Sequence, residues 1–181
     1  MLTKIVQLRS IATSPIRKYT TSKFLRDCFQ EVRDRSFIEA SDDHTLVYLC
    51  VFCYGGSNRW MAKWGKTDCS VEKRFYAHRY SYGIKDVDEY PPIIPLILIK
   101  CKNSKRREDD IKNRCKKFLH KVKNMNRVDS TLCEQTHDIA KAYDEIKKYC
   151  TEKELEYWSS VECEINEDNN VKWKGKWISV T

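Results

Sequence analysis

Two long apolar runs constrain the fold of this chain most strongly. Residues 45–53 and 93–101 are built almost entirely of β-branched, aromatic and other apolar side chains. Runs of this length and composition are typical of strands inside a sheet, buried on both faces. Because successive strand residues point to opposite faces, Tyr48 shares one face with Leu46 and Cys50. We therefore expect a small sheet that is covered by helices.

The segment between the two runs predicts a hairpin followed by a helix. A Gly-Gly-Ser-Asn turn separates the first run from a second strand over 59–65. The pattern then becomes helical, with Asp68 or Ser70 as N-cap. This helix is expected to run to about Tyr82, where Gly83 ends it.

The remaining segments are assigned from the spacing of their apolar residues. The spacing predicts helices over 22–34, 105–124 and 134–149, with Ser104 able to cap the second. A short helix over 152–158 and a hairpin of 160–165 with 171–180 are expected to follow, turning at Asn169-Asn170 or at Gly175. The predicted fold class is α+β: a three-stranded antiparallel sheet flanked by helices, with a C-terminal helix-hairpin extension.

The distribution of charge divides the chain and indicates a partner. The net charge is +8, yet residues 1–26 carry six basic residues and no acid, and residues 100–127 carry twelve basic and three acidic residues. A concentrated basic patch suits a polyanion such as nucleic acid. The bland alternative is a solvated helix face. We expect a basic tail over 1–26, a domain over 27–149 and an extension over 150–181.

Composition also bears on the compartment. Residues 1–26 are rich in Ser and Thr as well as basic, which fits either a mitochondrial transit peptide or a basic tail. No apolar run approaches the roughly 18 residues of a membrane helix, so no membrane association is expected. The nine scattered cysteines argue against a disulfide framework. These features predict an intracellular, reducing compartment: mitochondrial if the tail is a transit peptide, otherwise cytoplasmic or nuclear. The oligomeric state stays open.

Four side chains could carry out chemistry on a phosphodiester. Arg74 and His78 are four residues apart and project from one helix face. Glu108 lies beside the apolar stripe of the next helix and offers a hard oxygen ligand to a divalent metal. Tyr48 stands in the middle of the first strand. Cations and donors at the phosphate, with a metal and a group that orients water, are what phosphodiester hydrolysis requires.

The order of these residues resembles the GIY-YIG nuclease superfamily over about residues 45–145. Tyr48 stands at the first-strand tyrosine motif, and Lys63-Trp64-Gly65-Lys66-Thr67 is similar to the second motif of the phage- and virus-type branch. Arg74 and His78 match the helix pair, and Glu108 matches the metal-binding glutamate. Lys63 stands where the better-known members carry a tyrosine.

The resemblance implies a metal-dependent endonuclease that hydrolyses DNA, with Mg²⁺, or Mn²⁺, as cofactor. It implies that Tyr48 helps to activate water, that Arg74 and His78 stabilise the phosphate, and that Glu108 holds the metal. The residues expected to bind substrate are Lys63, Gly65, Lys66, Thr67, Lys105, Arg106 and Arg107.

Two other functions compete with this interpretation. The main alternative is a non-catalytic nucleic-acid-binding protein with a degenerate nuclease fold, in which Trp173 and Trp177 could stack on bases. Packing of both tryptophans against the core is favoured over stacking. A zinc module is disfavoured, because structural zinc needs four converging ligands. Its candidate sets are Cys50 with Cys53, and Cys115, His120, Cys133 and His137.

Overall fold

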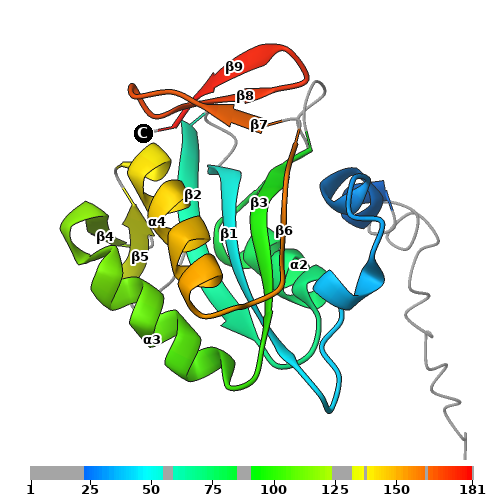
Figure 1. Cartoon of the computed structure of the whole chain (residues 1–181). Coiled ribbons are helices and arrows are strands. Elements are labelled where there is room, and N and C mark those ends of the chain that lie inside the picture. Colours follow the sequence, from blue (N-terminus) through cyan, green and yellow to red (C-terminus); the bar gives the residue numbers. More distant parts are fainter. Residues whose placement is uncertain are drawn as a thin grey trace, which may run out of the picture.

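A four-stranded antiparallel sheet forms the centre of the molecule (Figure 1). The computed structural model describes residues 23–54, 59–84, 91–123, 132–136, 138–161 and 163–180. The strands are β1 (Thr45–Tyr54), β2 (Arg59–Thr67), β3 (Ile93–Cys101) and β6 (Tyr157–Ser159), in the order β2-β1-β3-β6. The predicted antiparallel arrangement of the first three strands is confirmed.

The fourth strand corrects a prediction. The segment 152–158 was expected to be helical, but β6 pairs antiparallel with β3 through Ile97–Ile99. The preceding helix, α4 (Ile139–Glu152), ends at a C-cap on Lys153, and Glu154 has a positive φ of 52°. The chain then pairs with the free edge of β3 as a strand. Helix propensity depends on local sequence, so it does not predict this pairing. The 150–181 segment thereby contributes to the central sheet.

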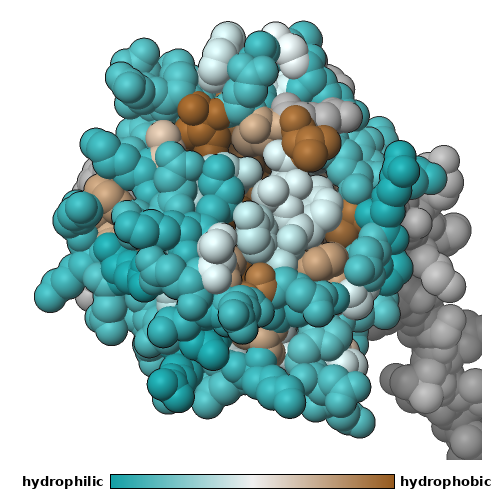
Figure 2. Space-filling view, in the orientation of Figure 1, coloured by the Kyte–Doolittle hydropathy of each residue, from teal (hydrophilic) through white to brown (hydrophobic). Residues whose placement is uncertain are grey.

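Helices cover both faces of the sheet, as the apolar runs predicted. On one face, α2 (Val71–Ser81) and a helical segment over 23–29 pack on alternate residues of β1, including Tyr48 and Cys50. On the other face, α3 (Ser104–Arg114) and α4 pack on Val47, Leu49 and Val51. Figure 2 shows that the outward surface on the side of α3 and α4 is mainly hydrophilic. Because Tyr48 and Cys50 belong to one core and Val47, Leu49 and Val51 to the other, the predicted alternation of side chains along β1 is confirmed.

Two of the predicted helices have different bounds. The segment 105–124 is helical only to Arg114; a 3-10 turn, η2 (Lys116–Phe118), and strand β4 (Leu119–Lys123) follow. β4 pairs with β5 (Leu132–Thr136), so α4 begins at Ile139 rather than at 134. Ile111, Cys115 and Phe118 are all buried as expected. Their helical spacing survives through the 3-10 turn, so the apolar stripe did not show where the helix stops.

The C-terminal segment forms a further antiparallel sheet of three strands. The chain turns at both of the alternative positions, so 171–180 is two strands where one was expected. The strands of this sheet are β7 (Cys163–Ile165), β8 (Asn170–Trp173) and β9 (Lys176–Ser179). Asn169 and Gly175, the residues at the two turns, have φ values of 60° and 81°. Trp173 is buried against the central sheet, whereas the side chain of Trp177 is exposed. Packing therefore accounts for the first tryptophan and not for the second.

The N-terminal predictions are tested only in part. Residues 1–22 lie outside the described residues, and 23–26 belong to the helical segment 23–29, shorter than the predicted 22–34. A short 3-10 turn, η1 (Arg35–Phe37), follows. Within the described part of the chain, no helix has the length and apolar character needed to cross a membrane. The eight cysteines whose side chains the structure describes all carry free thiols.

Candidate active site

The junction of β2 and α2 is fixed by short side chains that satisfy the free backbone N–H groups. Ser70 is the N-cap of α2, and its hydroxyl accepts a hydrogen bond from the backbone N–H of Lys73 at 3.4 Å. The Thr67 hydroxyl accepts from the N–H of Cys69 at 3.2 Å. Thr67, predicted to bind substrate, thus shapes the turn that sets the direction of the helix.

Tyr48 lies on β1 directly opposite Gly65 on β2. A Cβ atom added to Gly65 would lie 2.4 Å from the Tyr48 hydroxyl oxygen and 2.7 Å from Cζ. The Tyr48 side chain therefore occupies the space that any other residue at position 65 would need. The glycine of the Lys-Trp-Gly-Lys-Thr segment has a steric role in seating the tyrosine.

His78 joins Tyr48 in a buried hydrogen bond. The Tyr48 hydroxyl oxygen is 2.7 Å from His78 Nε2, and both side chains are buried. The ring of Phe75, one helical turn before His78, meets the Tyr48 ring edge-on at 5.3 Å. These contacts fix the phenol in one position against α2.

Arg74 and Glu108 both act on the Tyr48 hydroxyl. Burial raises the pKa of Tyr48 far above its usual value, and the neighbouring Cys50 and the Glu108 carboxylate raise that pKa too. The Arg74 guanidinium lowers it, as a positive charge and as a hydrogen-bond partner. Desolvation is the largest of these effects, so the pKa of Tyr48 stays raised. Arg74 itself is exposed, so the cluster reaches solvent through its guanidinium.

A clamp between α3 and the β2–α2 junction positions Glu108. Ser104 Oγ donates a hydrogen bond to Asp68 Oδ1 at 2.7 Å, and the Ser104 N–H donates to Thr45 Oγ1 at 2.9 Å. Glu108 lies one turn after Ser104, on the same helix face, and is half-buried. The structure thus joins Tyr48, His78 and Arg74 through hydrogen bonds, and the Glu108 carboxylate is near enough to act on the Tyr48 hydroxyl electrostatically.

Neither member of this clamp was recognised in the sequence. Asp68 was considered as a cap for α2, and Ser104 as the cap for α3. The α3 cap is instead Asn103, with a φ of 61°. A Ser and an Asp that are 36 residues apart carry no local signal of pairing.

The basic residues predicted to bind substrate lie on two elements: Lys63 and Lys66 on β2, and Lys105, Arg106 and Arg107 on α3. The Lys63 side chain is half-buried and lowers the pKa of Cys50, its partner across the strands. The ammonium of Lys66 pairs with Asp68 at 3.4 Å. Lys105 and Arg106 are exposed on the first turn of α3.

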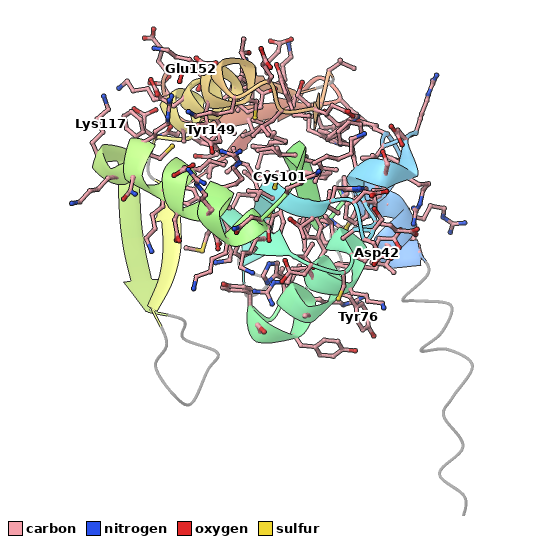
Figure 3. The ribbon with its side chains drawn as sticks, turned by 60° about the horizontal axis from the view of Figure 1, so that its bottom comes forward. Asp42, Tyr76, Cys101, Lys117, Tyr149 and Glu152 are labelled. Atoms are coloured by element: carbon pink, nitrogen blue, oxygen red, sulfur yellow. The ribbon has the colours of Figure 1, made fainter. Side chains whose placement is uncertain are left out.

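Arg107 is turned toward a different neighbour. Its guanidinium donates to the hydroxyl of Tyr149 on α4 at 3.1 Å, and that hydroxyl donates to Asp110 at 2.8 Å. Figure 3 shows Tyr149 where α4 lies beside α3. Arg107 thus links two helices, and the structure does not bring it to Tyr48.

Glu108 offers a hard oxygen ligand beside the Tyr48 cluster. A single half-buried carboxylate, Glu108, fits Mg²⁺, which commonly binds one or two carboxylates and retains several waters. Among the described side chains, no group of three or more His, Cys, Asp and Glu residues converges as metal ligands. Cys50 and Cys53 belong to opposite faces of the sheet.

The second zinc set is described only in part. Cys115 is buried in the core. The side chains of His120, Cys133 and His137 lie outside those that the structure describes.

No family model, curated protein or solved structure matches this chain.

Proposed function

We propose that this chain is a metal-dependent endonuclease of the GIY-YIG type that hydrolyses phosphodiester bonds in DNA. The observation that carries the proposal is the convergence on one phenol. Tyr48, seated over Gly65 and hydrogen-bonded to His78, interacts with both Arg74 and Glu108. The four side chains come from three different elements, β1, α2 and α3, and Gly65 comes from a fourth, β2. A cation, a carboxylate and a Tyr–His pair at one point are the parts that hydrolysis of a phosphodiester requires.

Tyr48 and His78 would act as a proton relay. A phenol with a raised pKa is rarely ionised at neutral pH, so Tyr48 can take up a proton only if a partner accepts the one it carries. In the tautomer with its proton on Nδ1, His78 Nε2 accepts the hydrogen bond from the phenol. The Tyr48 oxygen can then take a proton from the attacking water while its own proton passes to Nε2. The new P–O bond forms as the P–O bond to the leaving oxygen breaks. The leaving oxygen takes up a proton from solvent water, and His78 returns its extra proton to solvent.

Arg74 and Glu108 would act on the phosphate. The exposed guanidinium can bind the oxygens on which negative charge develops. Glu108 is the residue that would hold the divalent metal, Mg²⁺ or Mn²⁺, which supplies charge neutralisation and an oriented water when bound. Lys63, Lys66, Lys105 and Arg106 would contact neighbouring phosphates. Lys66 is adjacent in sequence to Gly65, and Lys105 and Arg106 precede Glu108 on α3.

The experiment is nicking of supercoiled plasmid with Mg²⁺ or Mn²⁺, with EDTA as the metal-free control. Arg74→Ala, Glu108→Ala and Tyr48→Phe should each slow nicking by about 10²-fold or more. Asp109→Ala is the matched control for Glu108, because it removes an exposed carboxylate from the next position of α3. Asp109→Ala should cut at the wild-type rate.

Binding measured in parallel separates the two candidate functions. Salt-sensitive binding of DNA without nicking in either metal would refute the endonuclease and leave the non-catalytic binder. That alternative is favoured by Lys63, which stands at the tyrosine position of the second motif. Equal nicking by the wild type and Glu108→Ala would also refute the proposal.

A further inference from the structure

The outer side of α2 carries an exposed stripe next to Arg74. Lys73, Arg74, Ala77 and Tyr80 are all exposed. Lys73, Ala77 and Tyr80 have the i, i+4, i+7 spacing that places residues on one side of a helix. Tyr80 is 65% exposed, and it is one of three large hydrophobic residues in the described chain that are markedly exposed. A water-facing aromatic ring about two helical turns from two exposed cations suits a ligand that is both aromatic and anionic.

The Tyr80 ring is held in place by aromatic neighbours. The hydroxyl groups of Tyr76 and Tyr80 are 2.6 Å apart, and their rings meet edge-on at 5.2 Å. Tyr76 in turn meets the Phe24 ring edge-on at 6.3 Å. Figure 3 shows Tyr76 on α2 at the outer edge of the molecule. A ring that is already fixed loses little conformational freedom when a ligand stacks on it.

The spacing along α2 matches a nucleotide beside the cleavage site. Arg74 and Tyr80 are separated by six residues, which is about 9 Å along the helix axis and about 120° around it. Ala77, the smallest side chain of the stripe, lies between them, so a ligand can approach the helix closely at that position. A phosphate at Arg74 would therefore have the adjoining sugar over Ala77 and its base within reach of Tyr80. Lys73 offers a second cation to the same strand.

We infer that this stripe stacks an unpaired nucleotide next to the phosphate that the active site cleaves. The inference rests on the proposed function, because Arg74 is the point where the two meet. An aromatic side chain can stack on a base whose face is free, as in single strands. A base inside continuous duplex already has both faces covered. The substrate class is therefore DNA with unpaired nucleotides at the cleavage site, such as a single strand or a flap.

The test measures binding without cleavage. Fluorescence anisotropy in EDTA would compare a labelled single strand, a blunt duplex of the same sequence and a duplex with a single-stranded flap. Tyr80→Ala should weaken binding of the single strand and the flap about tenfold, and binding of the duplex less than twofold. Tyr80→Trp should retain wild-type binding because it keeps a stacking surface.

Val161→Ala is the control, since it truncates another exposed large hydrophobic side chain, outside α2, to which no role in binding is assigned. It should leave single-strand binding unchanged. Unchanged binding by Tyr80→Ala, or an equal loss on duplex and single strand, would overturn the inference. Since no cutting is measured, a chain that never nicks DNA can still pass this test. A chain whose nicking depends on Glu108 can likewise fail it.

Discussion

Replacement of Gly65 by alanine tests the site most directly. The added Cβ would lie 2.4 Å from the Tyr48 hydroxyl oxygen, whereas an ordinary contact begins at 3.4 Å. The phenol would have to retreat by about 1.0 Å, the difference between these distances. Phe75 and His78 pack against the same ring, so it has little room to do so.

The expected cost has two parts. Overpacking of a well-filled site typically costs about 1–3 kcal/mol of unfolding free energy. Displacement of the hydroxyl by about 1 Å also breaks the 2.7 Å contact with His78 and should slow nicking about 10²-fold. Without the clash, Gly65→Ala should instead increase the free energy of unfolding, because alanine in a strand is favoured over glycine by roughly 0.5–1 kcal/mol.

A double-mutant cycle measured by urea unfolding separates the clash from other effects. Tyr48→Leu shortens the side chain, so the cost of Gly65→Ala should largely disappear in that background. In Tyr48→Phe the relief should be partial, because Cζ would still lie 2.7 Å from the new Cβ. If Gly65→Ala costs the same in all three backgrounds, the steric account of this glycine is wrong.

Two further predictions concern the clamp and the buried thiols. Ser104→Ala removes the hydrogen bond to Asp68 and should cost about 1 kcal/mol in urea unfolding. It should also slow nicking several-fold without weakening DNA binding, and an equal loss in both would refute a positioning role for Ser104. Burial raises the pKa of Cys50 from 9.0 to about 12. Because the unfolded thiol ionises first, stability is retained below pH 9 and falls as pH rises above it. Under reducing conditions, Cys50→Ala should lose about 1 kcal/mol less than the wild type between pH 8 and pH 10; identical losses would contradict the assignment.

Local patterns were sufficient for the central part of the fold. The apolar runs placed β1 and β3, and the strand alternation placed Tyr48 on the face covered by α2. Ser70 is the cap of α2, one of the two candidates in the sequence, and the helix ends at Ser81, two residues before Gly83. These features depend on neighbours within a few residues, so the sequence carries them directly.

The misassigned elements depend on partners that are distant in the chain. β6 is a strand because the edge of β3 is available to it. β4 and β5 are strands because they pair with each other, and the apolar spacing of 105–124 shows no sign of the change. An edge that captures a segment is a property of the assembled sheet.

The candidate site divides in the same way. The sequence alone determined which residue types are present and that Arg74 and His78 share a helix face. The tertiary structure decided that Glu108 approaches Tyr48, through the bond between Ser104 and Asp68. It also raised the pKa of Tyr48, because desolvation arises only when strands and helices close around the side chain. Proximity and burial are properties of packing, and no spacing along the chain specifies them.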